Sequence, residues 1–231
     1  MIEITPTEWT AIRLSMRVAA VATLLATPLG IALAWLLARR NFWGKSLLDA
    51  LIHLPLVLPP VVTGYLLLLT FGRRGLIGGW LAEHLGIVFA FRWTGAALAC
   101  GVMAFPLLVR PIRLSIEAVD QKLEHAAETL GAAPVRVFLT VTLPLALPGV
   151  LAGMVLGFAK AIGEFGATIT FVSNIPGETQ TISSAIYSLI QTPEGDAAAL
   201  RLVAVSIVIA IAALIGSEWF AWRATQRLHG N

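Results

Sequence analysis

The stretch LSMRVAAVATLLATPLGIALAWLLA, residues 14–38, decides the fold class of this chain. A helix of about 20 mainly apolar residues is long enough to cross the hydrocarbon core of a membrane. Because Arg13 and Arg17 precede the apolar run, a signal peptide is the alternative. The run is long, however, and it ends at Arg39-Arg40 without a convincing small-residue cleavage site. We therefore interpret residues 14–38 as a retained membrane span.

The composition of the whole chain agrees with a membrane protein. Of its 231 residues, 58% are hydrophobic and 13% are charged, and its mean hydropathy is +0.84. Soluble domains are roughly 45–50% apolar and about 25% charged. Five spans of about 20 residues would use roughly half of the chain. Too few residues remain for a separate soluble domain, which usually needs about 50–200. We predict an all-α, polytopic chain with a single membrane domain.

Four further spans follow the first, at residues 47–71, 93–109, 148–172 and 202–221, and Arg201 and Arg223 flank the last of them. The glycine-rich segment 72–92 is expected to fold as turns with a short amphipathic piece. Residues 181–191 have a helical pattern but are too few to span the membrane.

The distribution of basic residues orients these spans. With the N-terminus outside, nine Lys and Arg residues fall on the inner side and six on the outer side. Cytoplasmic loops carry an excess of Lys and Arg, so we predict an outer N-terminus and a cytoplasmic C-terminus. Residues 173–200 contain Glu178, Glu194 and Asp196 but no Lys or Arg, which agrees with an outer loop.

Several classes of site are excluded by the residues themselves. Cys100 is the only cysteine, and His53, His84, His125 and His229 stand too far apart for metal-ligand spacing, so no metal site is expected. A net charge of +3 without a basic run gives no indication of a nucleic-acid partner. The chain has no phosphate-binding Gly-x-x-x-x-Gly-Lys-Ser/Thr loop and no recognisable catalytic constellation. We expect no catalytic residue and no cofactor, and the energy for any transport must come from a partner.

The segment between the third and fourth spans, residues 117–144, carries the most specific pattern, QKLEHAAETLGAAPVRVFLTVTLP at residues 121–144. One mildly apolar helical face follows from the spacing i, i+3, i+4 and i+7. A glycine then supplies the left-handed position that ends a helix. The residues that form this face and its end are Leu123, Ala126, Ala127, Leu130 and Gly131.

A second helix is expected directly after this turn. Pro134 is placed to open it from its first turn, and Pro144 to end it. We interpret the segment as a helix–turn–helix outside the membrane, whose narrow alanine ridge fits a groove on another protein. An ordinary amphipathic surface loop is the alternative.

This loop resembles the signature cytoplasmic loop of binding-protein-dependent ABC importer permeases. The shared pattern is Ala126-Ala127, three residues, Gly131, nine residues, and a terminal Val141-x-Leu143-Pro144. The family usually has Glu directly before the alanines, where this chain has His125 with Glu124 one residue earlier. In the family, the loop is a coupling helix that docks into a cleft on the ATPase subunit. The resemblance implies this role for Leu123, Glu124, Ala126, Ala127, Leu130, Gly131, Leu143 and Pro144.

Three further segments resemble one branch of the family. The segment AKAIGEFGAT at residues 159–168 resembles the oxyanion permeases for molybdate and sulfate. The segments LPLVLPPVVTGY at residues 54–65 and NIPGETQTI at residues 174–182 resemble the molybdate permeases. The resemblance implies a type I ABC permease domain over residues 11–222 that translocates molybdate across the inner membrane.

The resemblance also implies an assembly. Its members would be a second copy of the chain, two ATP-binding subunits that carry ATP and magnesium, and a periplasmic or extracellular molybdate-binding protein, all within or beside membrane lipid. A sulfate, thiosulfate or tungstate permease is an alternative within the family. A secondary transporter or channel driven by an ion gradient is the alternative from another class, with Lys160 and Glu164 as its obvious ionisable candidates.

Candidate pathway or gate residues lie in the second and fourth spans. Three prolines remove backbone donors from the second span, so it must kink or break. Such a break is tolerated only against protein or a water-filled cavity. Lys160 and Glu164 stand four apart, so they either neutralise each other or act on a passing dianion. Packing kinks and helix–helix hydrogen bonds are the structural alternatives for the whole set: Pro59, Pro60, Thr63, Gly64, Lys160, Glu164, Gly166 and Thr168.

Overall fold

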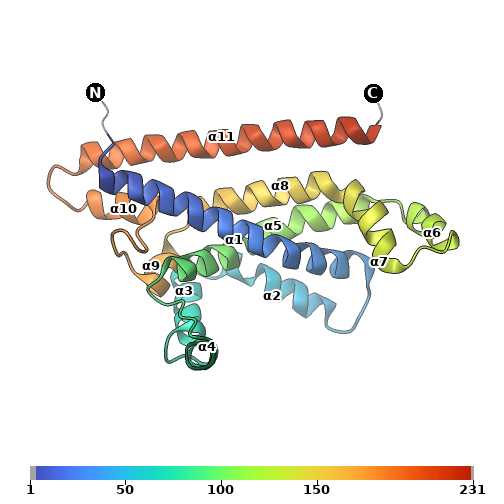
Figure 1. Cartoon of the computed structure of the whole chain (residues 1–231), viewed down its shortest axis with the longest axis horizontal. Helices are drawn as coiled ribbons and strands as arrows, with labels where there is room; N and C mark the ends of the chain where they lie inside the picture. Colours follow the sequence, from blue (N-terminus) through green and yellow to red (C-terminus); the bar gives the residue numbers. More distant parts are fainter. Residues whose placement is uncertain (1–3, 230–231) are drawn as a thin grey trace.

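The computed structural model of the chain describes the backbone of residues 4–229 and the side chains of residues 4–216. Every regular element in this part of the chain is helical, which confirms the all-α prediction. The helices form an elongated bundle (Figure 1). Its long members are α1 (Pro6–Arg39), α5 (Trp93–Ala118), α8 (Leu143–Ile162) and α11 (Asp196–His229).

Shorter helices connect or extend the long ones. Two of them, α4 and α10, correspond to the short pieces predicted within residues 72–92 and 181–191. The short helices are α2 (Lys45–Val57), α3 (Pro60–Phe71), α4 (Leu76–Leu85), α6 (Gln121–Thr129), α7 (Pro134–Val137), α9 (Gly166–Val172) and α10 (Ile182–Leu189).

Within the described residues, four helical segments are long and apolar enough to cross a membrane: Pro6–Arg39, Trp93–Ala118, Pro134–Ile162 and Asp196–Gly216. The α2–α3 pair passes the same test together but is bent by 115°. The five predicted spans therefore correspond to four long helical segments and one broken pair. The side chain of Arg223, the predicted flank of the last span, lies outside the described residues.

The third predicted span belongs to a longer helix. We expected a span at residues 93–109, but α5 continues to Ala118. The additional turns carry Arg113, which donates to Asp49 at 2.9 Å and to Glu117 at 2.8 Å. These ion pairs neutralise the charged side chains in the last turns of α5. The loop between the third and fourth spans therefore begins after Ala118, at the end of α5.

The fourth predicted span is not one helix. From α7 the chain continues through a π-helical segment, Phe138–Thr142, directly into α8. The prediction that Pro144 ends a helix is therefore wrong, because Pro144 lies in the first turn of α8, where no N–H is needed. At this junction the Leu143 N–H bonds to the Phe138 carbonyl, five residues back. The chain then breaks after Ile162 and resumes as α9.

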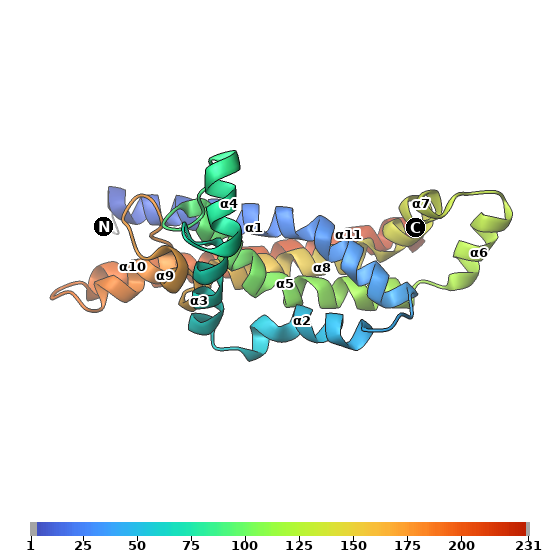
Figure 2. The same ribbon diagram turned by 90° about the horizontal axis from the view of Figure 1, so that it is seen from below.

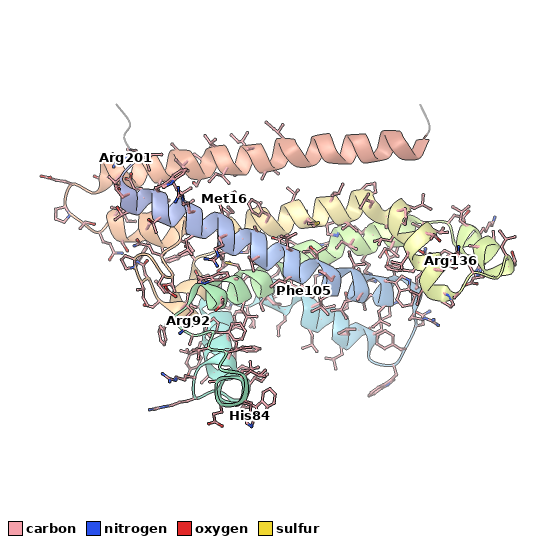
Figure 3. The ribbon with its side chains drawn as sticks, in the orientation of Figure 1. Met16, His84, Arg92, Phe105, Arg136 and Arg201 are labelled. Carbon is pink, nitrogen blue, oxygen red and sulfur yellow. The ribbon has the colours of Figure 1, made fainter. Side chains whose placement is uncertain are left out.

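The two ends of the bundle are formed by different short helices. The N-terminus, α9 and α10 lie at one end, and α6 and α7 lie at the other in both views (Figures 1 and 2). Figure 3 shows Arg201 and Arg136 at these opposite ends, and His84 at the tip of α4. This separation matches the two predicted sides of the membrane.

The core lies along α5, which packs between α1 and α8. Cys100 is fully buried on α5, with its Sγ 3.5 Å from the Ala161 carbonyl oxygen, as expected for a small core residue. Nearer the α6 end, Leu37 of α1 and Leu108 and Ile112 of α5 are also fully buried. The buried residues therefore extend along α5 toward both ends of the bundle.

Candidate coupling and translocation sites

The predicted helix–turn–helix is present at the α6 end of the bundle. The Asp120 carboxylate accepts the Lys122 N–H at 2.9 Å and so caps the start of α6. Gly131 has φ +87°, the left-handed conformation that glycine adopts without strain. Beyond this turn, Pro134 stands in the first turn of α7. Gly131 and Pro134 therefore have their expected structural effects, whereas Pro144 does not.

The outer face of this element is uncovered in the single chain. No residue of α6 is buried. Its apolar side chains are largely exposed, with Leu123 at 50% and Leu130 at 89%, and Val135 and Leu139 on the following helical segment are at 71% and 54%. A group of exposed apolar side chains on a protruding element is typical of a protein–protein contact. Ala126 and Ala127 lie on the same helix, which leaves its surface narrow.

Glu124 is grouped with these residues in the sequence but faces the bundle. Its side chain is only 14% exposed. Its Oε1 accepts hydrogen bonds from Arg39 Nη2 at 3.0 Å, from Arg39 Nε at 3.3 Å and from the Thr142 hydroxyl at 2.6 Å. Arg39 Nη2 also donates to the Val119 carbonyl oxygen at 3.0 Å. Glu124 therefore attaches α6 to the spans rather than adding to the exposed face.

Three further residues of the loop lie elsewhere: His125, which was not predicted as a coupling residue, and the predicted coupling residues Leu143 and Pro144. His125, at the position where related loops usually have Glu, is exposed and stands 3.3 Å from Glu128. Leu143 and Pro144 are half-buried at the start of α8. They lie at the joint between the loop and the span and not on the exposed face of α6.

The predicted break in the second span is confirmed, and Figure 2 shows α3 turning sharply away from α2. Pro59 is the N-cap of α3 and Pro60 is its first residue. Neither residue has an N–H that would be left without a partner, so the two prolines suit the start of a helix.

The structure brings this break against α9. A Cβ added to Gly64 would lie 2.5 Å from the Ala167 carbonyl oxygen, and one added to Gly166 would lie 2.7 Å from Pro60 Cβ. Only glycine allows the two helices to approach this closely. Pro60, Gly64 and Gly166, which were predicted separately in two spans, therefore form one packed contact.

Lys160 and Glu164 form the predicted ion pair, with Nζ and Oε2 2.6 Å apart. The Glu164 side chain is 1% exposed and that of Lys160 is 28% exposed. Glu164 stands in the break between α8 and α9, and its Oε1 also accepts the Ala167 N–H at 3.0 Å. The carboxylate thus joins the end of α8 to the first turn of α9, which favours a structural role for the pair.

The threonines near this contact differ in their hydrogen bonding. The Thr168 hydroxyl donates to the Phe165 carbonyl oxygen at 2.9 Å, so its proton is used locally. Thr63 is 5% exposed, and its hydroxyl has no partner among the described residues. Of the two, Thr63 keeps a free hydrogen-bonding group beside the α3–α9 contact.

One groove of the described structure suits an oxyanion poorly. An apolar groove of about 660 Å³ lies between α1, α2 and α5. Among its lining residues only Trp93 and Thr94 carry a polar side-chain atom, whereas a dianion needs several donors. Within the described part of the chain, no group of three or more His, Cys, Asp and Glu side chains could hold a metal ion.

Sequence reasoning missed the residues that hold elements together across the bundle. Arg39 and Arg201 were interpreted only as topology signals. Arg39 in fact binds Glu124, and Arg201 binds the buried Glu8 of α1, with Nη2 2.7 Å from Oε1. The partners are 85 and 193 residues apart in the chain, so no local pattern pairs them.

A bundle of long apolar helices, broken spans that meet at close contacts, and a protruding inter-span helix define a membrane permease subunit of the ABC importer class. Residues 26–226 match the family described as "Binding-protein-dependent transport system inner membrane component". The chain belongs to this family and is a multi-pass membrane protein.

Two relatives match almost the whole chain. The molybdenum transport system permease protein ModB of Escherichia coli (strain K12) is 61% identical over 218 residues, which is 94% of this chain and 95% of the relative. The ModB protein of Haemophilus influenzae (strain ATCC 51907 / DSM 11121 / KW20 / Rd) is 58% identical over 225 residues, 97% of this chain and 98% of the relative.

Solved structures share the fold. The crystal structure of a bacterial ABC transporter involved in the import of the acidic polysaccharide alginate has a TM-score of 0.74 at 17% identity, covering 95% of this chain and 80% of that chain. An inward-facing structure of the MetNI methionine ABC transporter has a TM-score of 0.72 at 13% identity, covering 96% and 99%. The chain therefore has the type I ABC importer permease fold.

Proposed function

We propose that this chain is the permease subunit of an ATP-driven molybdate importer and moves molybdate across the cytoplasmic membrane into the cell. The observation that carries the proposal is high identity, over nearly the full length, to permeases named for molybdenum transport. The chain has no phosphate-binding loop of its own, so ATP and magnesium belong to a partner and no cofactor is assigned to this chain.

The proposed assembly contains two copies of the chain and two ATPase subunits. Each copy docks one ATPase through the exposed face of α6, which carries Leu123, Ala126, Ala127 and Leu130. A molybdate-binding protein delivers the substrate at the opposite end of the bundle. Closure of the ATPase pair on ATP then draws the two α6 helices together and opens the spans toward the outside.

The pathway in this proposal runs along the two-fold axis, beside the α3–α9 contact. Conduction needs sites that bind an ion weakly enough to release it. Neutral hydroxyls such as that of Thr63 satisfy this condition, whereas an unpaired lysine would hold a dianion too firmly. The pairing of Lys160 with Glu164 supports this arrangement, because it leaves little net charge at the contact.

A secondary transporter driven by an ion gradient is the second candidate. It would need membrane-embedded ionisable groups that are free to take up and release protons or ions. The residues that could serve, Lys160 and Glu164, bind each other, and Glu164 also bonds the backbone of α9. These contacts favour the ATP-driven importer over this alternative.

Reconstitution tests the proposed function. The chain is placed in vesicles with its partner ATPase and a molybdate-binding protein, and ATP hydrolysis and molybdate uptake are measured together. We expect molybdate-loaded binding protein to stimulate hydrolysis and uptake, and unloaded binding protein to do so far less. Stronger stimulation by sulfate, or uptake driven by an ion gradient without ATP, would contradict the proposal.

Thiol labelling tests the proposed orientation. Gly177 and Lys122 are exposed at opposite ends of the bundle, so each is replaced by cysteine in a Cys100→Ala background. A membrane-impermeant thiol reagent should label the first variant in intact cells and the second only after permeabilisation. Labelling of Lys122→Cys in intact cells would reverse the topology and remove α6 from the ATPase side.

A further inference from the structure

The attachment of α6 to the rest of the molecule depends on one carboxylate. The local side-chain hydrogen bonds of α6 join His125 to Glu128 and the Thr129 hydroxyl to the Ala126 carbonyl oxygen. Among the described residues, every side-chain hydrogen bond between α6 and another element involves Glu124. A helix without a buried residue thus has a single side chain that forms hydrogen bonds to the spans.

Four segments of the chain meet at this carboxylate. Arg39 is the last residue of α1, and it reaches both Glu124 Oε1 and the carbonyl oxygen of Val119, the C-cap of α5. Thr142 is the last residue of the π-helical segment that leads into α8. The group therefore joins the ends of α1 and α5, the helix α6 and the start of α8.

The physical character of this group differs from that of a surface ion pair. Exposed pairs contribute little, because water screens the charges and long side chains lose entropy. Here the Arg39 side chain is 9% exposed and that of Glu124 is 14% exposed, and both charges have additional hydrogen-bond partners. Charge-assisted hydrogen bonds are stronger than neutral ones, and several of them at low exposure hold the geometry of the group.

A second contact ties the same segments together. The rings of Trp35, one turn before Arg39, and Phe138, the first residue of the π-helical segment, are packed edge to face with centroids 6.0 Å apart. Short π-helical turns within α-helices are rare and frequently occur at functional sites. The end of α1 thus contacts the first residue of the π-helical segment directly and reaches its last residue, Thr142, through Glu124.

We propose that Arg39, Glu124 and Thr142 form the linkage that transmits a displacement of α6 to α1 and α8, and that Arg39 and Glu124 are positioning residues for coupling. The inference rests on the proposed function, in which an ATPase moves α6. A docking helix without this linkage would turn or slide on its flexible connections. With it, the movement of α6 carries the inner ends of two spans.

Spin-label distances in the assembled transporter test the linkage directly. One label pair is placed on Gln121→Cys of both copies and reports on α6. The other is placed on Trp43→Cys, a fully exposed position in the short loop between α1 and α2, and reports on the end of α1. In the otherwise unaltered protein, trapping nucleotide in the ATPase should shift both distance distributions.

The substitution Glu124→Gln keeps the size of the side chain and removes its charge. We expect the α6 distance to shift with nucleotide as before, and the shift at residue 43 to fall by half or more, together with molybdate moved per ATP hydrolysed. Arg39→Gln and Thr142→Val should act in the same direction. The control is Glu128→Gln, an exposed carboxylate on the same helix, which should leave both shifts unchanged.

The result that overturns the linkage is an unchanged shift at residue 43 in both Glu124→Gln and Arg39→Gln. A loss of ATPase binding and of uptake in equal proportion, with uptake per ATP unchanged, would also reduce the group to a structural role. The distance measurement needs nucleotide but no molybdate. Failure of molybdate to stimulate the unaltered complex would therefore contradict the proposed substrate and leave the decision about the linkage intact.

Discussion

The helices α6 and α9 are both short, yet they are held in opposite ways. α6 has 9 residues and none is buried, so one carboxylate fixes it to the bundle. α9 has 7 residues, of which Ala167, Thr168, Phe171 and Val172 are buried, and it fits against α3 without spare volume. A partner can therefore move α6 as a unit. The tight packing of α9 against α3, in contrast, leaves no room for a larger side chain at the contact.

This difference predicts where substitutions damage the fold and where they damage function alone. Changes around α9 should lower the stability and abundance of the protein. Changes on the exposed face of α6 should leave the protein folded and should reduce only ATPase binding and uptake.

The largest effect is expected from Lys160→Met, which leaves the buried Glu164 carboxylate without its cation. Breaking a buried ion pair costs about 3–5 kcal/mol, and we expect the lower end because Lys160 is 28% exposed. Glu164→Gln should be milder, since the amide oxygen can still accept the Ala167 N–H. Thermal unfolding in detergent measures both.

The double replacement of Lys160 by Met and Glu164 by Gln should partly restore stability, because no unpaired charge remains. If Glu164→Gln lowers the stability more than Lys160→Met does, the carboxylate has a role besides neutralising the charge of Lys160.

A smaller loss is expected from Gly64→Ala at the α3–α9 contact. The new Cβ would meet the Ala167 carbonyl oxygen at 2.5 Å, so the two helices must separate. Overpacking of this kind costs about 1–3 kcal/mol, which corresponds to a fall of roughly 2–4 °C in Tm per kcal/mol for a chain of this length.

Gly79→Ala is the matched control for this substitution. Gly79 lies within α4, and a Cβ there would meet only the Arg73 carbonyl oxygen, at 3.6 Å. Alanine should therefore be neutral or slightly stabilising at this position. Equal unfolding temperatures for the two variants would show that α3 and α9 do not pack as tightly as the comparison requires.

The sequence predicted the α6 region far better than the α9 region, because its signals are local. The alanine spacing, Gly131 and Pro134 lie within one short segment, and each determines the backbone near it. The contact of Gly64 with Ala167 joins residues that are distant in the chain, and no local pattern selects which glycine faces which helix. Pro59 and Pro60 predicted a break but not its direction.

The same limit explains why the linkage at Glu124 was missed. Arg39 at the end of a span fits the rule for cytoplasmic loops, so its charge already had an explanation. Its partner, Glu124, lies 85 residues away in the sequence, and only folding brings the two side chains together. The motif identified Glu124 as part of the coupling loop, and the structure shows that it faces inward.

A substitution at the turn after α6 should separate folding from coupling. Gly131 has φ +87° with no atom within 4 Å of an added Cβ, so the backbone and not the space limits this position. Gly131→Val should cost about 1–2 kcal/mol locally and reduce co-purification of the ATPase and uptake. Gly131→Asn, which tolerates the left-handed conformation, should retain both, and equal losses in the two variants would contradict the assignment of this turn.

The smallest effect is expected from His125→Glu, which introduces the residue that related loops usually have. His125 is exposed and its contact with Glu128 is a surface pair, so its removal should change the free energy of unfolding by less than about 0.5 kcal/mol. The new carboxylate stands three residues before Glu128, and such repulsion on a helix surface costs only about 0.2–0.5 kcal/mol.

Stability should stay constant, and uptake at equal membrane abundance should change by less than about twofold, a free-energy difference below about 0.5 kcal/mol. A large fall in uptake at unchanged stability would mean that His125 itself contacts the ATPase. A large fall in stability would mean that α6 is packed as tightly against the bundle as α9 is.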